Sequence, residues 1–319
     1  MLKKRSNYFK TLPLLYAGVM LVAVITSCAS LTQTQVNLVH TLAVSSDTIT
    51  NTPASIFREL EQVRTGRGLF YAASLTTAHA HYREVSALAQ NKSQSIAEAK
   101  NAMAYIMALN SYTRALRSIS NNARWKSVGT EIRGVGNKTD SLFMAVNSTG
   151  YLDNTLPEGA WKLAGQSVAF LAESYMKVRR TKVVKSFVIE SDSLVAACVE
   201  SLIDVLRSPS LDALLEHETV SLENDYRAYL DAVALKGQLI PMSYDERYIE
   251  LRNSLNSAKY ARTRCVISLR AFARAHHKLS LCLENPGRRV SNERLFDLYK
   301  AIIQMNTLTG KITDYIETI

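Results

Sequence analysis

Cysteine, proline and glycine are scarce in this sequence, which has 4 cysteines, 6 prolines and 12 glycines among 319 residues. No two cysteines form a CxxC unit, and the spacing of the four matches no zinc-ligand pattern. The sequence also lacks a P-loop, a GxSxG nucleophile elbow, a dinucleotide fingerprint and an HExxH motif. Because these are the common signals of phosphate, acyl-transfer, nicotinamide and zinc chemistry, we expect neither an enzyme nor a cofactor.

Alternating runs of Val, Ile and Thr, which are typical of half-buried strands, are nearly absent as well. The segments between prolines are rich in Ala, Leu, Ser, Glu, Lys and Arg, and no glycine occurs between Gly165 and Gly237. Proline breaks a helix interior, so we expect Pro53, Pro157, Pro209, Pro241 and Pro286 at helix starts or in loops. The pattern predicts helices at 54–90, 93–123, 128–148, 158–206, 210–238, 243–284 and 291–319.

Apolar residues recur at intervals of three and four in the second half of the chain. Three such seams can be written: Leu215, Leu222, Tyr226, Tyr229 and Val233; Cys265, Leu269, Phe272, His276, Leu279 and Leu283; and Leu295, Leu298, Ile302, Met305, Ile312, Ile316 and Ile319. Narrow seams of this period are typical of bundles and coiled coils. Short connections at 208–209, 241–242 and 285–287 favour antiparallel neighbours. The predicted fold is therefore all-α, an elongated antiparallel helical bundle with long helices.

The beginning of the chain has the layout of a secretory signal. The first ten residues contain four basic side chains and no acid, and residues 11–25 are mostly apolar. This apolar run is shorter than the ~20 residues that span a bilayer. It ends in Ile25-Thr26-Ser27-Cys28, which resembles the lipobox of bacterial lipoproteins, although Leu is usual at the position of Ile25.

The resemblance implies that residues 1–27 are removed and that Cys28 carries the lipid. The residue after it is Ala29, whereas Asp at this position favours retention in the inner membrane of lipoproteins. We therefore expect an outer-membrane anchor that faces the periplasm. Residues 28–52 are rich in Thr, Ser, Gln and Asn and are predicted to be a lipidated tether, with a loose helix in part of it. Residues 53–319 then form the bundle, and four glycines between 129 and 150 suggest a subdivision near 124–157.

The charge of the mature chain is mild. The whole sequence has a formal charge of +10, of which the signal supplies four positive charges, so +6 remains. Such a balance does not indicate nucleic acid. The densest basic cluster is Lys177, Arg179, Arg180, Lys182 and Lys185, a candidate patch for an anionic partner. Two predicted helices have opposite charges, acidic in 212–231 and basic in 252–278, which favours antiparallel neighbours with complementary flanks or, alternatively, an exposed basic face.

Two pairs of residues that contain histidine are the remaining candidates, namely His81 with Glu84 and His276 with His277. His81 and Glu84 lie one turn apart on a predicted helix and could share a metal. Their spacing is similar to the glycine-x-His-x-x-Glu motif of imelysin-like helical periplasmic proteins, with His79 in place of the glycine. The alternative is that both are solvent-facing polar residues. His276 falls in an apolar seam and is predicted to be a hydrogen-bonded core histidine, whereas its neighbour His277 is predicted to be exposed.

Two function classes follow from the sequence. The first is a lipid-anchored, non-enzymatic scaffold or adaptor, whose partners are the membrane at Cys28 and an envelope protein. The second is a helical lipoprotein that binds a ligand or a metal at His81 and Glu84. Cys198, Cys265 and Cys282 are predicted to be free thiols, because two of them lie in apolar seams and the predicted helix offsets are too long for a disulfide.

Replacing Cys28 by Ala is expected to abolish acylation, because no other cysteine follows a lipobox. The precursor should then stay uncleaved or be released in part from the membrane. Metabolic labelling with a palmitate analogue measures this directly. Equal label in the parent and in Cys28→Ala would refute the anchor.

Overall fold

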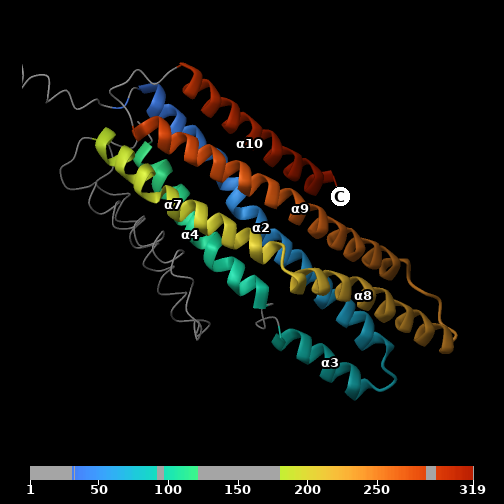
Figure 1. Cartoon of the computed structure of the whole chain (residues 1–319). Helices are drawn as coiled ribbons and strands as arrows, with labels where there is room; N and C mark the ends of the chain where they lie inside the picture. The colour runs from blue at the N-terminus through green and yellow to red at the C-terminus, as the bar shows by residue number, and fades with distance from the viewer. Residues whose placement is uncertain (1–30, 32, 92–96, 121–179, 285–291, 319) are drawn as a thin grey trace, which may run out of the picture.

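The computed structural model describes residues 31, 33–91, 97–120, 180–284 and 292–318, and within these ranges the chain is all-α. Its helices are packed into an elongated bundle (Figure 1). They are α2 (Gln33–Ser74), α3 (Ala78–Asn91), α4 (Ala97–Ser120), α7 (Arg180–Leu206), α8 (Pro209–Leu235), α9 (Met242–Glu284) and α10 (Asn292–Thr318). The prediction of an all-α fold with long helices is confirmed.

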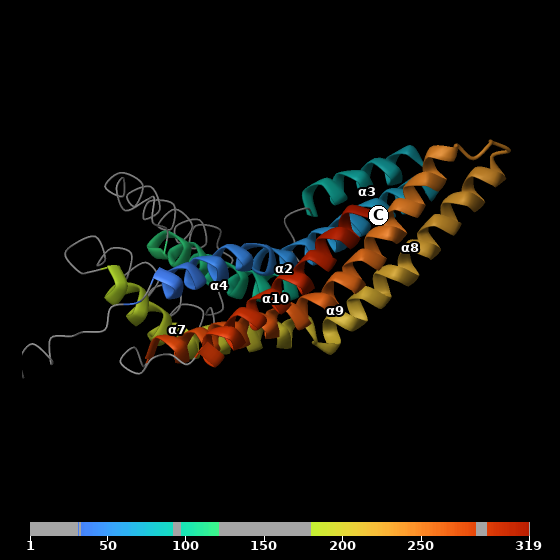
Figure 2. The same cartoon turned by 90° about the horizontal axis from the view of Figure 1, so that it is seen from above.

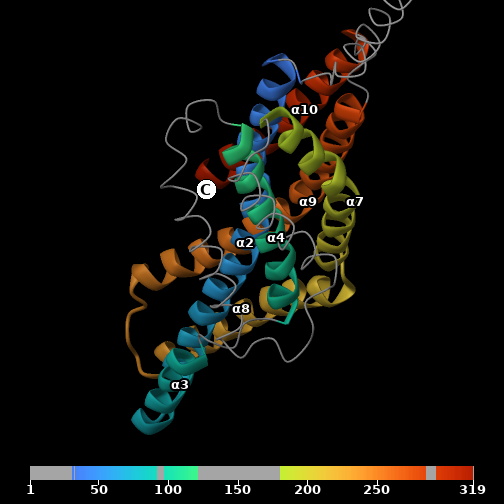
Figure 3. The same cartoon turned by 90° about the vertical axis from the view of Figure 1, so that its left-hand side faces the viewer.

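The two longest helices, α2 and α9, run antiparallel along the length of the molecule (Figure 1). In the half where α2 begins, α4 packs on α2, α7 packs on α9, and α4 and α7 pack on each other. This closes a four-helix bundle, which Figure 3 shows from that end. Its core is filled by apolar side chains from all four helices, including Leu42, Leu109, Phe187 and Phe272. The half where α2 begins is called the proximal half below.

In the other, distal half, α8 takes the place of α7 on α2 and α9, and α3 packs on the end of α2. The prediction that 208–209 joins antiparallel neighbours is wrong, since α8 continues along the molecule in the direction of α7 (Figure 1). Pro209 opens the first turn of α8, and Ser208 caps it by accepting a hydrogen bond from the Leu211 amide. The proline and its cap thus bend the path without reversing it.

The helix α10 lies along α9 and also touches α2, on the outside of the bundle (Figure 2). Leu298, Ile302 and Met305 are buried against them, as the seam predicts. Near the start of α10, the Arg294 carbonyl accepts a hydrogen bond from the Cys282 thiol of α9 at 3.7 Å. The helix ends partway along α9 and does not reach the distal end of the bundle (Figures 1 and 2).

The predicted tether is wrong for residues 33–52, which form the first part of α2. Val39, Leu42 and Ile49 are fully buried in the main core. Polar composition misled the prediction because Ser and Thr can satisfy their own hydroxyls within a helix. Ser46, also fully buried, donates to the Leu42 carbonyl at 2.6 Å, and Thr50 donates to the Ser46 carbonyl at 3.1 Å.

The expected helix start at Pro53 is also wrong, since Pro53 lies inside α2. Proline has no amide hydrogen, so α2 lacks one intrahelical bond at this turn. The apolar side chains on either side, Ile49, Ile56 and Leu60, are fully buried, and their packing holds the helix continuous through the proline. Tertiary burial outweighs the local preference at this position.

The single helix predicted at 54–90 is divided into α2 and α3 by a turn at 75–77. The Thr77 hydroxyl accepts a hydrogen bond from the Ala80 amide at 3.2 Å and so caps the start of α3. The His81 ring donates through Nδ1 to the Ala72 carbonyl at 2.8 Å, which satisfies an acceptor at the end of α2. α3 therefore folds back on α2.

The signal at 1–27, the lipidation site Cys28 and the subdivision near 124–157 lie outside the described residues. In the ranges that are described, no helix is both long enough and apolar enough to cross a bilayer.

Cys198, Cys265 and Cys282 are buried free thiols, which confirms that prediction. The Cys198 thiol donates to the Tyr105 carbonyl at 3.6 Å. Burial raises the pKa of Cys198 to about 12 and raises that of Cys265 as well.

We expect Cys198 and Cys265 to resist alkylation in the folded protein. A pKa of about 12 leaves Cys198 with about 1,000-fold less thiolate near neutral pH than a cysteine at the reference value of 9.0. Mass spectrometry after iodoacetamide treatment should show no label on either residue in buffer and full label on all three thiols in denaturant. Rapid labelling of Cys265 without denaturant would contradict this packing.

Candidate functional site

The connection between α8 and α9 forms a protruding apex at the distal end of the molecule (Figures 1 and 2). Every residue from 234 to 244 is exposed. Gly237 has φ +63°, and its amide bonds back to Ala234, so the glycine ends α8 in the left-handed conformation that other residues disfavour. Pro241 follows, and α9 starts at the next residue.

The side chains on this apex are unusually apolar for an exposed turn. Leu235 is 89% exposed, Leu239 94% and Met242 72%, and Ile240 and Tyr244 are partly exposed at 42% and 40%. Between residues 232 and 244 the one charged side chain is Lys236. We call Leu235, Leu239, Ile240 and Met242 the apex residues.

Beneath the apex lies a cluster of aromatic rings. Phe70 from α2 contacts Tyr226 edge-on at 5.1 Å between ring centroids, and Tyr226 stacks on Tyr248 at 4.3 Å. Tyr229 stacks on Tyr244 at 4.7 Å. Aromatic pairs of this kind contribute about 0.5–1.5 kcal/mol beyond the area they bury. The rings join α2, α8 and α9 and give the apex a firm base.

One polar contact completes the base. The Tyr226 hydroxyl donates to the Asp245 carboxylate in the first turn of α9. Burial and this carboxylate together raise the pKa of Tyr226 to about 12, so the phenol stays protonated as a donor. The contact ties the two helices together next to the turn that joins them.

Farther from the apex, an ion pair between a partly buried arginine and a buried glutamate holds α8 against α2. Glu218 is 1% exposed, and one of its carboxylate oxygens accepts from Arg67 Nε at 2.5 Å. The same guanidinium donates through Nη1 to Asp225 at 3.0 Å. Although burial alone would lower the pKa of Arg67, the two carboxylates outweigh it and raise that pKa. Arg67 therefore holds two turns of α8 at once.

A third acidic side chain of α8, Asp212, pairs with the basic helix α9, where it accepts a hydrogen bond from Arg262. The prediction of complementary flanks is confirmed for this pair. It is wrong for Glu218 and Asp225, whose partner is Arg67 on α2. The pairing of α8 with α2 was not predicted, because the two helices lie far apart along the chain.

His81 and Glu84 lie on α3, next to the apex. His81 lines a hollow of about 550 Å³ together with Tyr229 and Tyr244, and its Nδ1 is engaged with Ala72. Glu84 is half-buried and does not line this hollow. Across the described ranges, no three His, Cys, Asp or Glu side chains are grouped closely enough to hold a metal ion.

A polar network is buried in the proximal half. The Tyr112 hydroxyl and His276 Nε2 are 2.5 Å apart, and His276 Nδ1 is 2.7 Å from one oxygen of Asp192. The other oxygen of Asp192 is 2.7 Å from His277 Nδ1. Tyr112 and His276 are fully buried and His277 is 61% exposed, so both histidine predictions are confirmed.

One proton arrangement satisfies every atom of this network. With Asp192 ionised, both imidazoles donate to it through Nδ1, and His276 accepts the Tyr112 proton at Nε2. Burial alone would raise the pKa of Asp192, but the hydrogen bonds from His276 and His277 outweigh it and lower that pKa. Burial and the Asp192 charge raise the pKa of Tyr112. The network joins α4, α7 and α9, and it has no opening for a substrate at Tyr112.

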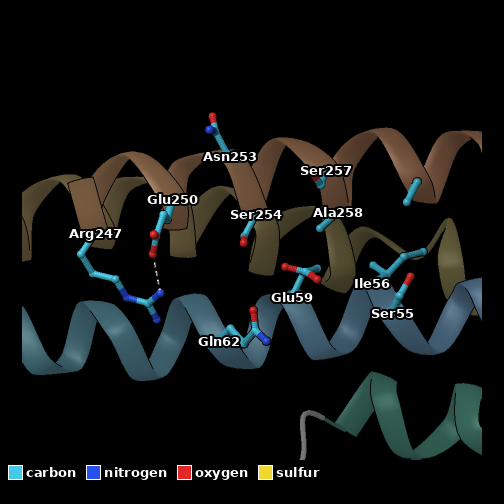
Figure 4. A pocket seen from close by; sticks show the side chains of 11 residues that line it. Ser55, Ile56, Glu59, Gln62, Arg247, Glu250, Asn253, Ser254, Ser257 and Ala258 are labelled. Atoms are coloured by element: carbon cyan, nitrogen blue, oxygen red, sulfur yellow. Dashed lines mark hydrogen bonds and ion pairs between the residues drawn. The ribbon is translucent and has the colours of Figure 1, made fainter. Parts of the chain in front are cut away.

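A shallow groove of about 310 Å³ runs between α2 and α9 (Figure 4). Glu59 and Gln62 of α2 face Ser254 of α9 across it. Arg247 and Glu250, at one end of the groove, pair with each other at 2.8 Å. The groove is lined by polar and apolar side chains in about equal parts, and its charged side chains Glu59, Arg247 and Glu250 do not converge on one point.

The predicted basic cluster is described only in part. Lys177 and Arg179 lie outside the described residues, and Arg180 and Lys182 are in the first turn of α7. Lys185 donates to the Glu284 carbonyl at the end of α9, at 3.2 Å. This contact is the kind that a lysine makes with the negative end of a helix.

Comparisons with protein families, with curated proteins and with solved structures found no match to this chain.

The sequence-based reasoning missed the apex as a candidate site. The signal was present, since Leu239, Ile240 and Met242 surround Pro241 in a segment that was correctly assigned to a helix connection. Connections are normally polar, so apolar residues at this place are informative. The partners of His276 could not be foreseen, because Tyr112 and Asp192 come from helices 164 and 84 residues away.

Replacing Tyr112 by Phe should lower the free energy of unfolding by about 1–3 kcal/mol, because His276 Nε2 would be left buried without a donor. The ring shape is preserved, so the fold should survive. Chemical denaturation followed by circular dichroism measures the change. An unchanged stability would show that the contact contributes nothing.

The same network predicts a dependence on pH. A lowered pKa means that Asp192 stabilises the fold above the unfolded value of about 4, and that this contribution disappears as pH falls through the folded value. Asp192→Asn should therefore reduce stability at pH 7 and flatten the loss on acidification. Glu190→Gln, an exposed change on the same helix, is the matched control and should alter neither.

Proposed function

We propose that this chain is a lipid-anchored, non-enzymatic scaffold or adaptor of the bacterial envelope. In this proposal the acylated Cys28 fixes the chain to the outer membrane, on its periplasmic side. The helical body then carries a contact surface away from that membrane. The observation on which the proposal rests is the apex, where Leu235, Leu239 and Met242 are exposed at the end remote from the beginning of α2.

The geometry supports a role in spacing. The described chain begins at the proximal end and the apex lies at the distal end (Figures 1 and 2). α9 alone has 43 residues, which corresponds to about 65 Å at 1.5 Å per residue. A body of this form separates the anchor from the apex by a distance that its helices set.

The placement of the polar groups supports a non-enzymatic role. The Tyr112, His276 and Asp192 network joins three helices, and each of its ring and carboxylate atoms has a partner. Arg67 and Glu218 likewise join two helices. In both places the charged and titratable groups serve helix packing.

The proposal is tested by a photo-crosslinking amino acid placed at Leu239 in living cells. An adaptor that works through its apex should give crosslinks there to an envelope component, whether lipid or protein, that mass spectrometry can identify. Ile303 on α10, 47% exposed, is the matched control and should give few. Equal or absent crosslinking at the two positions would refute an apex-based adaptor.

A further inference from the structure

The apex residues have the chemistry of a bilayer interface. Aliphatic side chains protrude farthest, Lys236 is the one charge among them, and Tyr244 follows within the same turn. A second tyrosine, Tyr71, is 43% exposed in the last turn of α2 at this end. Tyrosine favours the headgroup level of a membrane, and lysine can extend its charge to the same level while its stem lies in the apolar layer.

The acidic residue nearest to the turn has its carboxylate engaged within the protein. Asp245 is half-buried and accepts the Tyr226 hydroxyl at the base of the apex. Residues 232–244 therefore present one positive charge and no negative one, and the exposed Asp231 and Glu246 lie just outside this segment. This sign complements the anionic headgroups of bacterial lipids.

The form of the apex argues against a protein as its occupant. The four side chains on the protruding turn offer on the order of a few hundred Å². A stable protein interface buries about 800 Å² on each partner. A fluid bilayer, in contrast, can adapt to a small protruding turn, including the side on which Leu239 lines the hollow beside His81.

We propose that the apex inserts into the boundary between headgroups and acyl chains of a second bilayer, so that the protein links two membranes. This proposal rests on the proposed lipid anchor, because the anchor supplies the first attachment. The apex and the beginning of the described chain lie at opposite ends of the body (Figures 1 and 2). A molecule whose long axis stands perpendicular to the anchoring membrane therefore presents its apex to a second membrane.

The test uses the full-length acylated protein in donor vesicles, with protein-free acceptor vesicles of phosphatidylethanolamine and phosphatidylglycerol. Leu239→Trp reports the position of the apex, with the parent signal from Trp125 and Trp161 subtracted. The emission should shift to the blue on addition of acceptor vesicles, and brominated lipid in the acceptor should quench it. Quenching by brominated lipid in the donor alone would overturn the link between two membranes.

Association between vesicles supplies the second readout. Leu239→Asp combined with Met242→Asp should reduce co-flotation of acceptor with donor vesicles by about 100-fold, since one large aliphatic side chain contributes about tenfold or more to partitioning. Ile303→Asp on α10 is the matched control and should stay within about twofold of the parent. Circular dichroism should be the same for all, because Leu239, Met242 and Ile303 are exposed at 94%, 72% and 47%.

The two proposals fail in different ways. If Cys28 is not acylated, a molecule has only its apex for lipid attachment and acceptor vesicles do not float with donor vesicles, while an apex that binds lipid still shifts the emission of Leu239→Trp. If the donors are loaded and neither shift nor co-flotation occurs, the membrane-inserting apex is wrong and the anchor stands. Association that requires a protein in the acceptor membrane would also overturn the proposal.

Discussion

The antiparallel packing of α2 on α9 is the contact on which the rest of the structure depends. Each other extensive contact between described helices involves one of these two, except the contact between α4 and α7. α2 and α9 approach each other closely at Gly66, where an added Cβ would lie 2.5 Å from a methyl of the buried Leu251. Two residues on, Gly68 leaves similar room for Leu88 of α3. Between them Arg67 binds α8, so three consecutive residues of α2 receive three different helices.

The two halves of the bundle are stabilised by different means. The proximal half has a broad apolar core with one polar network, and its helices come from four separate segments. The distal half relies on the Arg67 ion pairs and on stacked tyrosines. A buried ion pair contributes little net stability compared with apolar packing, but it fixes one arrangement, because a buried Glu218 without Arg67 would be strongly unfavourable.

Much of the fold could be predicted from periodicity, and the errors have identifiable causes. The seam through Leu269, Phe272 and His276 marks the buried face of α9 because a narrow apolar face repeats at helical spacing. Residues 33–52 were assigned to a tether because polar composition was taken as a sign of exposure. Composition cannot reveal that Ser46 and Thr50 bond to the carbonyls of their own helix. The change of direction expected at Pro209 was wrong because a short connection fixes where a helix ends and leaves open where the next one goes.

The residues of the apex can be divided into those that the turn requires and those that it does not. The turn between α8 and α9 needs Gly237 for its left-handed residue and tolerates Pro241 just before the next helix. Neither requirement involves Leu239 or Met242, which are 94% and 72% exposed and so contribute little to the packing of the folded chain. Exposed aliphatic side chains on a protruding turn favour aggregation, and polar residues would form the same turn without that disadvantage. Stability therefore does not account for their apolar character, whereas the proposed contact with a bilayer would.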